Sequence, residues 1–229
     1  MPVAIVTGGS RGFGRALVLD LASDGWGVVF DGRRASDVEH VKDELRDRHD
    51  RVTALAGDVI DPAHREALVR AASALGSLDL LVNNASTLGP TPLARLDAYP
   101  LDAFRTVFEL NVLAPLALVQ LALPALRASR GTVVALSSDA AIEGYETWGA
   151  YGSSKAALDQ LQAVLGTEEH ALRVYAFDPG DMRTDMHQAA FAGENILDRP
   201  LPESVVPRFR ALLDSGAPSG RYRAQEFAT

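Results

Sequence analysis

The chain has 229 residues, 47% hydrophobic and 23% charged, which is the balance of one globular domain with a sizeable core. Its formal net charge of −8, without a concentrated Lys/Arg stripe, argues against nucleic acid or an anionic membrane surface as the main partner. The absence of cysteine excludes disulfides and a cysteine nucleophile, and the five histidines have no ligand spacing, so we expect no metal site.

Short apolar runs alternate with segments of helical periodicity along the chain. In order, the runs typical of strands buried on both faces are Val3–Val6, Val28–Phe30, Val52–Leu55, Leu80–Val82, Val133–Leu136 and Val174–Phe177, with a last strand at Tyr222–Phe227. The helical segments are Gly12–Ser23, Ser36–Arg48, Asp61–Ala74, Asp102–Ser129, Tyr151–Glu168 and Ser204–Asp214. The alternation predicts one α/β domain over residues 1–229, with a Rossmann-like, doubly wound parallel sheet of about seven strands. The stretch 186–202 has neither period and is interpreted as a loop or lid over the substrate.

Two helix starts carry capping signals. Ser36 and Glu39 have the spacing of a capping box, and Asp61 precedes a proline at the first helical position. The N-terminus has no basic region typical of a signal peptide, and we expect no apolar run long enough to span a bilayer. We therefore expect a cytoplasmic protein without a membrane partner.

A glycine-rich turn follows the first strand. Gly8, Gly12 and Gly14 stand in the pattern Thr-Gly-x-x-x-Gly-x-Gly, directly before the first helix. Glycines let backbone N–H groups approach a pyrophosphate, and the positive end of the helix dipole then faces the anion. This context predicts a dinucleotide site; the alternative is a tight turn whose glycines serve packing alone.

Tyr151 and Lys155 stand one helical turn apart, so their side chains share a face and can act on one small volume. Alone, such a pair more often marks a plain amphipathic helix with a half-buried tyrosine and a solvated lysine. The surrounding motifs decide between the two interpretations. In order, they are Thr7-Gly8-Gly9-Ser10-Arg11-Gly12-Phe13-Gly14, Asp58-Val59, Asn83-Asn84-Ala85, Asn111, Ser138, Tyr151-x-x-x-Lys155 and Pro179-Gly180.

Over nearly its whole length the chain resembles the short-chain dehydrogenase/reductase family in its single-domain form. The resemblance implies a catalytic set of Asn111, Ser138, Tyr151 and Lys155. It implies cofactor contacts from Gly8, Ser10, Arg11, Gly12, Phe13, Gly14, Arg33, Asp58, Val59, Asn84, Ala85, Tyr151, Lys155, Pro179, Gly180 and Thr184. The chain departs from the family at Ser86, where glycine is usual, and at Asp181, for which the sequence suggests no role.

The second strand bears on which nicotinamide cofactor binds. An acidic residue about 20 residues beyond the glycine turn reads the ribose 2′-OH in such folds, whereas a nearby arginine accepts a 2′-phosphate. In the family's register that acidic position is Gly32, followed by Arg33, and Arg11 in the turn is a second cation. We therefore expect NADP(H). Asp31, one residue early, is the alternative that would favour NAD(H), and a solvated strand end is the alternative role of Arg33.

Tyr151 is the expected proton donor or acceptor. A phenol with a pKa of about 10 needs nearby positive charge to act near neutral pH, which the Lys155 ammonium supplies. Ser138, rather than Ser137 on the other face of its strand, is expected to hold the substrate oxygen. Pro115 lacks an N–H, so an α-helical count leaves the Asn111 carbonyl free to bind a water leading to Lys155; a simple helix kink is the alternative.

These observations predict an oxidoreductase that transfers a hydride between NADP(H) and a small carbonyl or secondary alcohol. The alternatives are an NAD-linked alcohol dehydrogenase and a non-catalytic NADP(H)-binding regulatory protein. Family members often assemble through the helices that hold Asn111 and Tyr151 and through the last strand, so we expect a homodimer or homotetramer.

Overall fold

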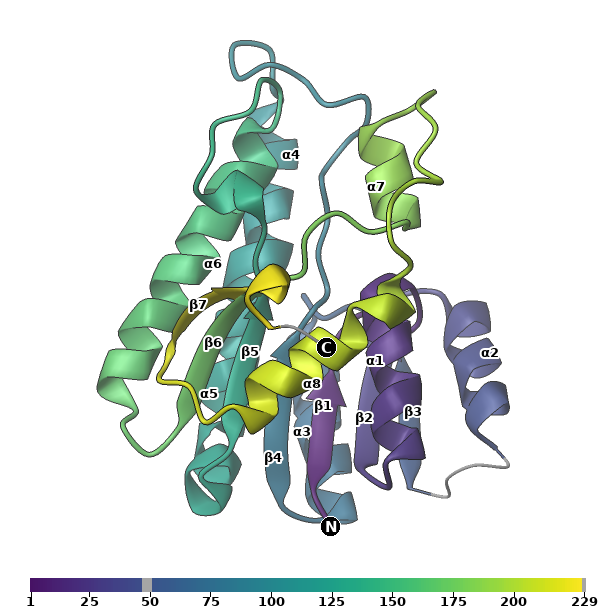
Figure 1. Ribbon diagram of the computed structural model, residues 1–229, viewed down its shortest axis with the longest axis vertical. Coiled ribbons are helices and arrows are strands. Elements are labelled where there is room, and N and C mark those ends of the chain that lie inside the picture. The colour runs from purple at the N-terminus through teal and green to yellow at the C-terminus, as the bar shows by residue number, and fades with distance from the viewer. Residues whose placement is uncertain (47–50, 228–229) are drawn as a thin grey trace.

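A seven-stranded parallel sheet runs through the computed structural model, which describes residues 1–46 and 51–227 (Figure 1). The strands are β1 (Val3–Val6), β2 (Gly27–Gly32), β3 (Val52–Ala56), β4 (Leu78–Asn83), β5 (Thr132–Leu136), β6 (Arg173–Asp178) and β7 (Gly220–Arg223). Their order is β3-β2-β1-β4-β5-β6-β7. The direction in which successive strands are added to the sheet reverses between the neighbouring strands β1 and β4. In sheets of this kind a crevice forms at that point, at the carboxyl ends of the strands. The predicted doubly wound, Rossmann-like sheet is confirmed.

Helices cover both faces of the sheet (Figure 1). One layer holds α1 (Gly12–Ser23), α2 (Ala35–Leu45) and α8 (Val206–Asp214); the other holds α3 (Pro62–Leu75), α5 (Ala114–Ser129) and α6 (Gly149–Glu168). Alternate strand residues enter the two cores: Ala4 and Val6 face α1, whereas Val3 and Ile5 face α3 and α5. Burial on both faces explains why the strands are continuous apolar runs.

The two capping predictions have different outcomes. Asp61 caps α3, and its Oδ1 accepts a hydrogen bond from the Ala63 N–H at 2.9 Å. The capping box at Ser36 is wrong, because α2 begins at Ala35 and places Ser36 inside its first turn. Arg34 precedes α2, and its side chain pairs with Asp37 at 2.8 Å instead of capping the helix. The expected end of this helix, at residues 47–48, lies outside the described residues.

The last strand lies earlier than the sequence predicted. β7 ends at Arg223, and a 3₁₀ turn follows at Ala224–Glu226. The Glu226 carboxylate accepts the Arg223 N–H at 2.7 Å, which bends the chain away from the sheet. Phe227 then packs against the ring of Tyr222, so the two aromatic residues that suggested one strand belong to a strand and the turn after it.

The predicted long helix is interrupted by a wider turn. α4 (Leu101–Phe108) continues through a π-helical turn, Glu109–Leu113, into α5. An 18-residue window within Leu101–Ser129 has a mean hydropathy of 1.7. By length and composition alone this helical stretch could cross a membrane, so the expectation that no apolar run would be long enough is wrong. Half of that window is buried, and α5 packs on β4 and α3, which accounts for its apolar residues within the fold.

The segment 186–202 is only partly the loop that was expected. A short helix, α7 (Asp185–Ala190), begins just before it, and Thr184 accepts the His187 N–H at the helix start. A 3₁₀ turn at Pro202–Ser204 then leads into α8. Together with the loop before α6, α7 rises above the carboxyl ends of the strands (Figure 1).

Candidate active site

A cleft of about 1070 Å³ lies along the carboxyl ends of the strands. Fourteen of the residues expected at the site line it: Gly8, Ser10, Arg11, Gly12, Phe13, Arg33, Asp58, Val59, Asn84, Ala85, Tyr151, Lys155, Pro179 and Thr184. Gly14, Asn111, Ser138 and Gly180 are absent from the lining. The fold thus gathers most of the expected residues around one volume, and the other four lie beside it.

The two residues that follow β4 fix the glycine turn by hydrogen bonds. Thr7 Oγ1 accepts the N–H groups of Asn84 and Ala85, both at 3.0 Å. The Asn84 amide donates to the Thr7 carbonyl at 2.7 Å and to that of Gly8 at 3.1 Å. Gly8 has φ +65°, and a Cβ on Gly14 would collide with the Gly8 carbonyl and the Asn84 amide. Asn84 therefore shapes the turn, and Gly14 is required by close packing.

The turn suits an anionic cofactor. No side chain among the described residues caps the start of α1, and its first turn contains no acidic residue. The N-terminal N–H groups of α1 are thus available to an anion, which the helix dipole attracts. Gly12 has φ +53°, and because it has no side chain it leaves the backbone beside Thr184 accessible. These features fit the pyrophosphate of a dinucleotide.

Both carboxylate oxygens of Asp31 have polar partners within the protein. One carboxylate oxygen accepts the Gly8 N–H at 2.6 Å, and the other lies 3.0 Å from His64 Nε2. Asp31 is 2% exposed, and the His64 ring fills the space where a Cβ on Gly57 would lie. Sequence analysis missed His64, since no local pattern links it to a strand 33 positions earlier.

Arg33 and Arg11 differ in their surroundings. Arg33 lines the cleft and forms no ion pair with any of the residues the structure describes. Arg11 lies near two carboxylates, with Asp37 at 3.4 Å and Asp185 at 3.5 Å. Ser36, interpreted from sequence as a cap, lines the cleft instead. Arg33 is therefore the better placed cation for an added phosphate.

Tyr151 and Lys155 lie together on α6, with Lys155 Nζ 5.5 Å from the centroid of the tyrosine ring. Both are buried, at 8% and 2% exposure. Burial raises the pKa of Tyr151; a hydrogen bond with the Ser138 hydroxyl lowers it, Asp139 and Asp178 raise it, and a hydrogen bond with the Ser86 hydroxyl lowers it. Burial lowers the pKa of Lys155 to about 8, against the raising influence of Asp159 and Asp178. Without cofactor, the site therefore holds a neutral phenol.

The two serines after β5 diverge as their alternation predicts. Ser138 is directed to the Tyr151 side, donates to Asp139 Oδ1 at 2.9 Å and accepts the Ala140 N–H at 3.2 Å. Ser137 donates to Asp159 at 2.6 Å. Lys155 donates to the Leu136 carbonyl, at the end of β5, at 2.6 Å.

Asn111 lies in the π-helical turn, and its side chain is fully engaged. Its Nδ2 donates to the Thr87 carbonyl and to Ser154 Oγ, both at 2.9 Å, while Oδ1 accepts from the Thr87 N–H and the Ser86 hydroxyl. Ser154 in turn donates to the Tyr151 carbonyl at 2.7 Å. Ser86, noted from sequence only as a departure from glycine, thus connects Asn111 with Tyr151. The water route from the Asn111 carbonyl stays a prediction.

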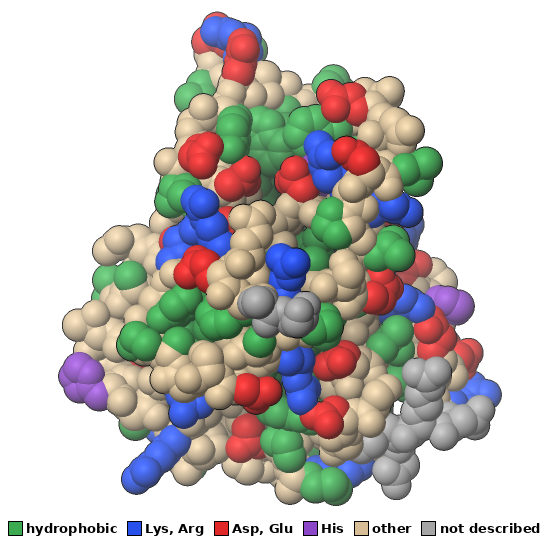
Figure 2. Space-filling view, in the orientation of Figure 1, with side chains coloured by type: hydrophobic (Ala, Val, Ile, Leu, Met, Phe, Trp, Pro, Cys, Tyr) green, Lys and Arg blue, Asp and Glu red, His purple; other side chains and the backbone are tan. Residues whose placement is uncertain are grey.

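A cluster of apolar residues packs around Tyr151. Trp148 and Tyr151 have ring centroids 5.6 Å apart, and Trp148 and Phe191 lie at 5.8 Å. Leu88, Met186 and Ala190 complete this cluster. Figure 2 shows hydrophobic side chains gathered in the upper part of the molecule, with acidic side chains around them. The site can therefore accept an apolar organic group beside a polar, proton-bearing centre.

Asp181 has a role that its sequence position did not suggest. It lies 3.5 Å from Arg199 Nε and 3.8 Å from His187 Nδ1. Asp181 thereby connects the end of β6 with α7 and with the return segment that follows. Among the described residues, no group of three or more His, Cys, Asp or Glu side chains is arranged to hold a metal ion.

Comparison with known proteins agrees with this geometry. A family model described as short chain dehydrogenase matches residues 2–195. An uncharacterised oxidoreductase of Saccharomyces cerevisiae is 34% identical over 228 residues, which is 96% of this chain and 87% of the relative. Sepiapterin reductase of Mus musculus is 36% identical over 201 residues, covering 82% and 77% of the two chains.

A solved structure extends the comparison to the fold. A protein from Shigella flexneri, assigned as a short chain dehydrogenase and complexed with NADP, superimposes with a TM-score of 0.90. It is 27% identical, and the match covers 98% of this chain and 97% of that one. By this family match and these relatives, the chain belongs to the short-chain dehydrogenase/reductase family of pyridine-nucleotide-dependent oxidoreductases.

Proposed function

We propose that this protein is an NADP(H)-dependent reductase that interconverts small organic carbonyls and secondary alcohols. The observation that carries the cofactor choice is the enclosure of Asp31, whose two carboxylate oxygens face the Gly8 N–H and His64. Asp31 lines the cleft, but with both oxygens already hydrogen-bonded it is a poorer partner for a ribose hydroxyl than a free carboxylate. The position after it is Gly32, where an added Cβ would collide with Ser10. Arg33 beside the cleft is then available for a 2′-phosphate.

The chain's own residues supply the proton chemistry. The nicotinamide would supply or accept the hydride when bound. Tyr151, held neutral by burial, is placed to donate the proton that a reduced carbonyl oxygen needs. Ser138 beside it can donate a hydrogen bond to the same oxygen, because its hydroxyl is free to rotate from Asp139. The neutral phenol supports reduction as the favoured direction near neutral pH.

The apolar cluster around Trp148 and Phe191 supports a substrate with an apolar or aromatic group. The sepiapterin reductases among the relatives support reduction of a carbonyl, and the NADP complex of the Shigella protein supports the cofactor. A non-catalytic NADP(H)-binding regulator is the competing hypothesis, which turnover of any carbonyl would exclude.

Titration with NADPH and with NADH, followed by nicotinamide fluorescence, tests the cofactor proposal. Arg33→Asp should weaken NADPH binding by at least about tenfold, because a charge-assisted contact to phosphate is lost, and leave NADH binding nearly unchanged. Arg34→Asp is the matched control, since Arg34 already pairs with Asp37 and should matter little. Asp31→Asn should keep the NADPH preference. Equal losses of both cofactors in Arg33→Asp, or tighter NADH binding to the wild type, would contradict the proposal.

We also propose that the protein forms a homodimer through α5 and α6. Leu121 on α5 and Val164 on α6 are 41% and 43% exposed. Between these helices lies a shallow apolar hollow of about 80 Å³, lined in part by Leu116, Leu158 and Leu161. A second copy packed on this face would remove that apolar surface from water.

A further inference from the structure

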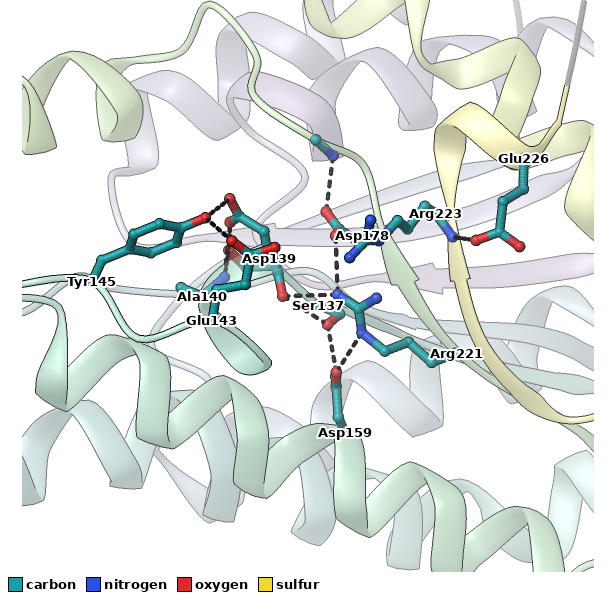
Figure 3. A network of polar contacts seen from close by, with 12 residues as sticks. Ser137, Asp139, Ala140, Glu143, Tyr145, Asp159, Asp178, Arg221, Arg223 and Glu226 are labelled. Carbon is teal, nitrogen blue, oxygen red and sulfur yellow. Dashed lines mark hydrogen bonds and ion pairs between the residues drawn. The ribbon is translucent and has the colours of Figure 1, made fainter.

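Arg221 is an arginine of the last strand that the sequence analysis did not consider. Its side chain reaches the carboxyl ends of β5 and β6 and the catalytic helix α6 (Figure 3). Nε donates to Asp159 Oδ2 at 3.0 Å, and Nη2 lies 2.9 Å from both the Ser138 carbonyl and Asp178 Oδ2. The guanidinium therefore contacts three segments that come from distant parts of the chain.

Each partner of Arg221 belongs to a segment of the active site. Asp159 lies one helical turn beyond Lys155 on α6, and it also accepts the Ser137 hydroxyl at 2.6 Å. Asp178 accepts the Gly180 N–H at 3.0 Å and so orients the Pro–Gly turn expected beside the nicotinamide. The third partner is the backbone of Ser138 itself. Movement of the guanidinium would loosen all three segments at once.

The same contacts balance charge behind the catalytic pair. The charged groups that act on Lys155 are Asp159 on its own helix and Asp178 on β6, and both raise its pKa. Asp139, which follows Ser138, and Asp178 both raise the pKa of Tyr151. The carboxylates of Asp159 and Asp178 are 13% and 7% exposed, so water screens them little, and Arg221 supplies the countercharge.

We propose that Arg221 is a positioning residue that aligns Ser138, the Pro179–Gly180 turn and α6 and neutralises the buried carboxylates behind Tyr151 and Lys155. Loss of its charge leaves this region more negative by one unit. The added negative charge stabilises the Lys155 ammonium and disfavours the Tyr151 phenolate, so both groups then hold their protons to higher pH. The catalytic consequence rests on the proposed function, whereas the electrostatic consequence does not.

Lys155 can be titrated directly, because Lys42 and Lys155 are the two lysines of the chain. In a Lys42→Arg background with isotope-labelled lysine, nuclear magnetic resonance follows Lys155 alone. Arg221→Gln should raise its titration midpoint from about 8 by about one pH unit, and Arg221→Lys should restore most of the wild-type value. Arg127→Gln is the matched control, since Arg127 pairs with Glu169 at the far end of α6.

The second readout is the pH profile of kcat for NADP⁺-dependent oxidation of 1-phenylethanol, or of another alcohol found by screening. Arg221→Gln should move the alkaline rise of kcat upward by about one pH unit, which lowers the rate about tenfold below that rise. Thermal unfolding confirms that each variant is folded. An unchanged Lys155 midpoint in folded Arg221→Gln, or an equal shift in Arg127→Gln, would overturn the inference. Absence of turnover in the wild type would contradict the proposed function and leave the lysine titration as the deciding measurement.

Discussion

At the scale of single residues, burial governs the protonation of the Tyr151–Lys155 pair. Tyr151 and Lys155 lie almost entirely out of water, and burial disfavours the charged form of each. It therefore raises the pKa of the phenol and lowers that of the amine, opposing the mutual attraction that a phenolate and an ammonium would have. The oxidised nicotinamide, which is cationic when bound, would move Tyr151 back towards ionisation. In the resting protein Tyr151 therefore keeps its proton, as the proposed reduction requires.

Lys155, which the proposed function places in the catalytic set, should lower the stability of the folded protein. Its pKa falls from 10.5 to about 8 on folding, so near neutral pH the folded state bears a cost of about 3 kcal/mol. The lost hydrogen bond to the Leu136 carbonyl offsets about 1 kcal/mol of any gain from removing the lysine. Lys155→Met should therefore be inactive yet more stable by about 2 kcal/mol in urea unfolding near neutral pH.

The pH dependence of this difference follows from the direction of the shift. Between the folded pKa of about 8 and the unfolded value of 10.5, the unfolded state binds more protons, so wild-type stability rises with pH in this window. The advantage of Lys155→Met should shrink across it. A variant that is less stable than the wild type at both ends of the window would contradict the argument.

At the scale of elements, the π-helical turn between α4 and α5 determines where the Asn111 side chain lies. The Ala114 N–H donates to the Glu109 carbonyl, five residues back, just before Pro115. Pro115 has no N–H, so one carbonyl before it loses its partner. The five-residue count makes that carbonyl Leu110, whereas the four-residue count of an α-helix makes it Asn111. The turn places the Asn111 side chain among Ser86, Thr87 and Ser154. Such bulges often occur at functional sites.

Asn111→Ala separates the two roles considered for this residue. Removing the amide leaves buried partners on Thr87 and Ser154 without their hydrogen bonds, which should destabilise the protein by about 2–3 kcal/mol. Because Ser154 also bonds the Tyr151 carbonyl, kcat should fall as well. Urea unfolding and steady-state kinetics measure the two effects. Full activity and stability would mean that the backbone carbonyl alone matters.

At the scale of the whole molecule, the sheet gathers the site residues, and an exposed apolar face on α5 and α6 bears on assembly. The seven strands bring residues from every part of the chain to one edge, while α5 and α6 leave Leu121 and Val164 exposed. Tyr151 lies on α6, and Asn111 lies in the π-helical turn that leads into α5. Association on this face would therefore also restrict movement of the site. The proposed dimer thus couples assembly to catalysis.

Leu121→Glu tests the assembly. A carboxylate on this surface would have to be desolvated in a packed interface, so the variant should elute as a monomer in size-exclusion chromatography with light scattering. Glu168→Gln, on α6, serves as a control that adds no charge. An unchanged oligomer in Leu121→Glu would place the interface elsewhere, and a monomeric wild type would contradict the dimer.

The amino-acid sequence by itself determined the layered fold and the chemical classes of the site residues. Strand and helix periodicities are local, so six of the seven strands and the catalytic helix lie where the periodicities placed them. The glycine turn and the Tyr151–Lys155 spacing are local too. The misplaced elements, β7, the start of α2 and α7, are those whose ends depend on a contact, such as the Glu226 carboxylate bonding back to Arg223.

Tertiary structure decided what each polar side chain faces. Asp31 and His64, or Arg221 with Asp159 and Asp178, meet only when strands and helices pack, and no spacing along the chain encodes their distance. In the sequence, Asp31 could have indicated NAD(H). In the packed molecule it is buried and accepts the Gly8 N–H, so it supports the glycine turn. Burial, which sets the pKa of Tyr151 and Lys155, is likewise a property of the packed molecule, because it depends on how completely neighbouring elements exclude water.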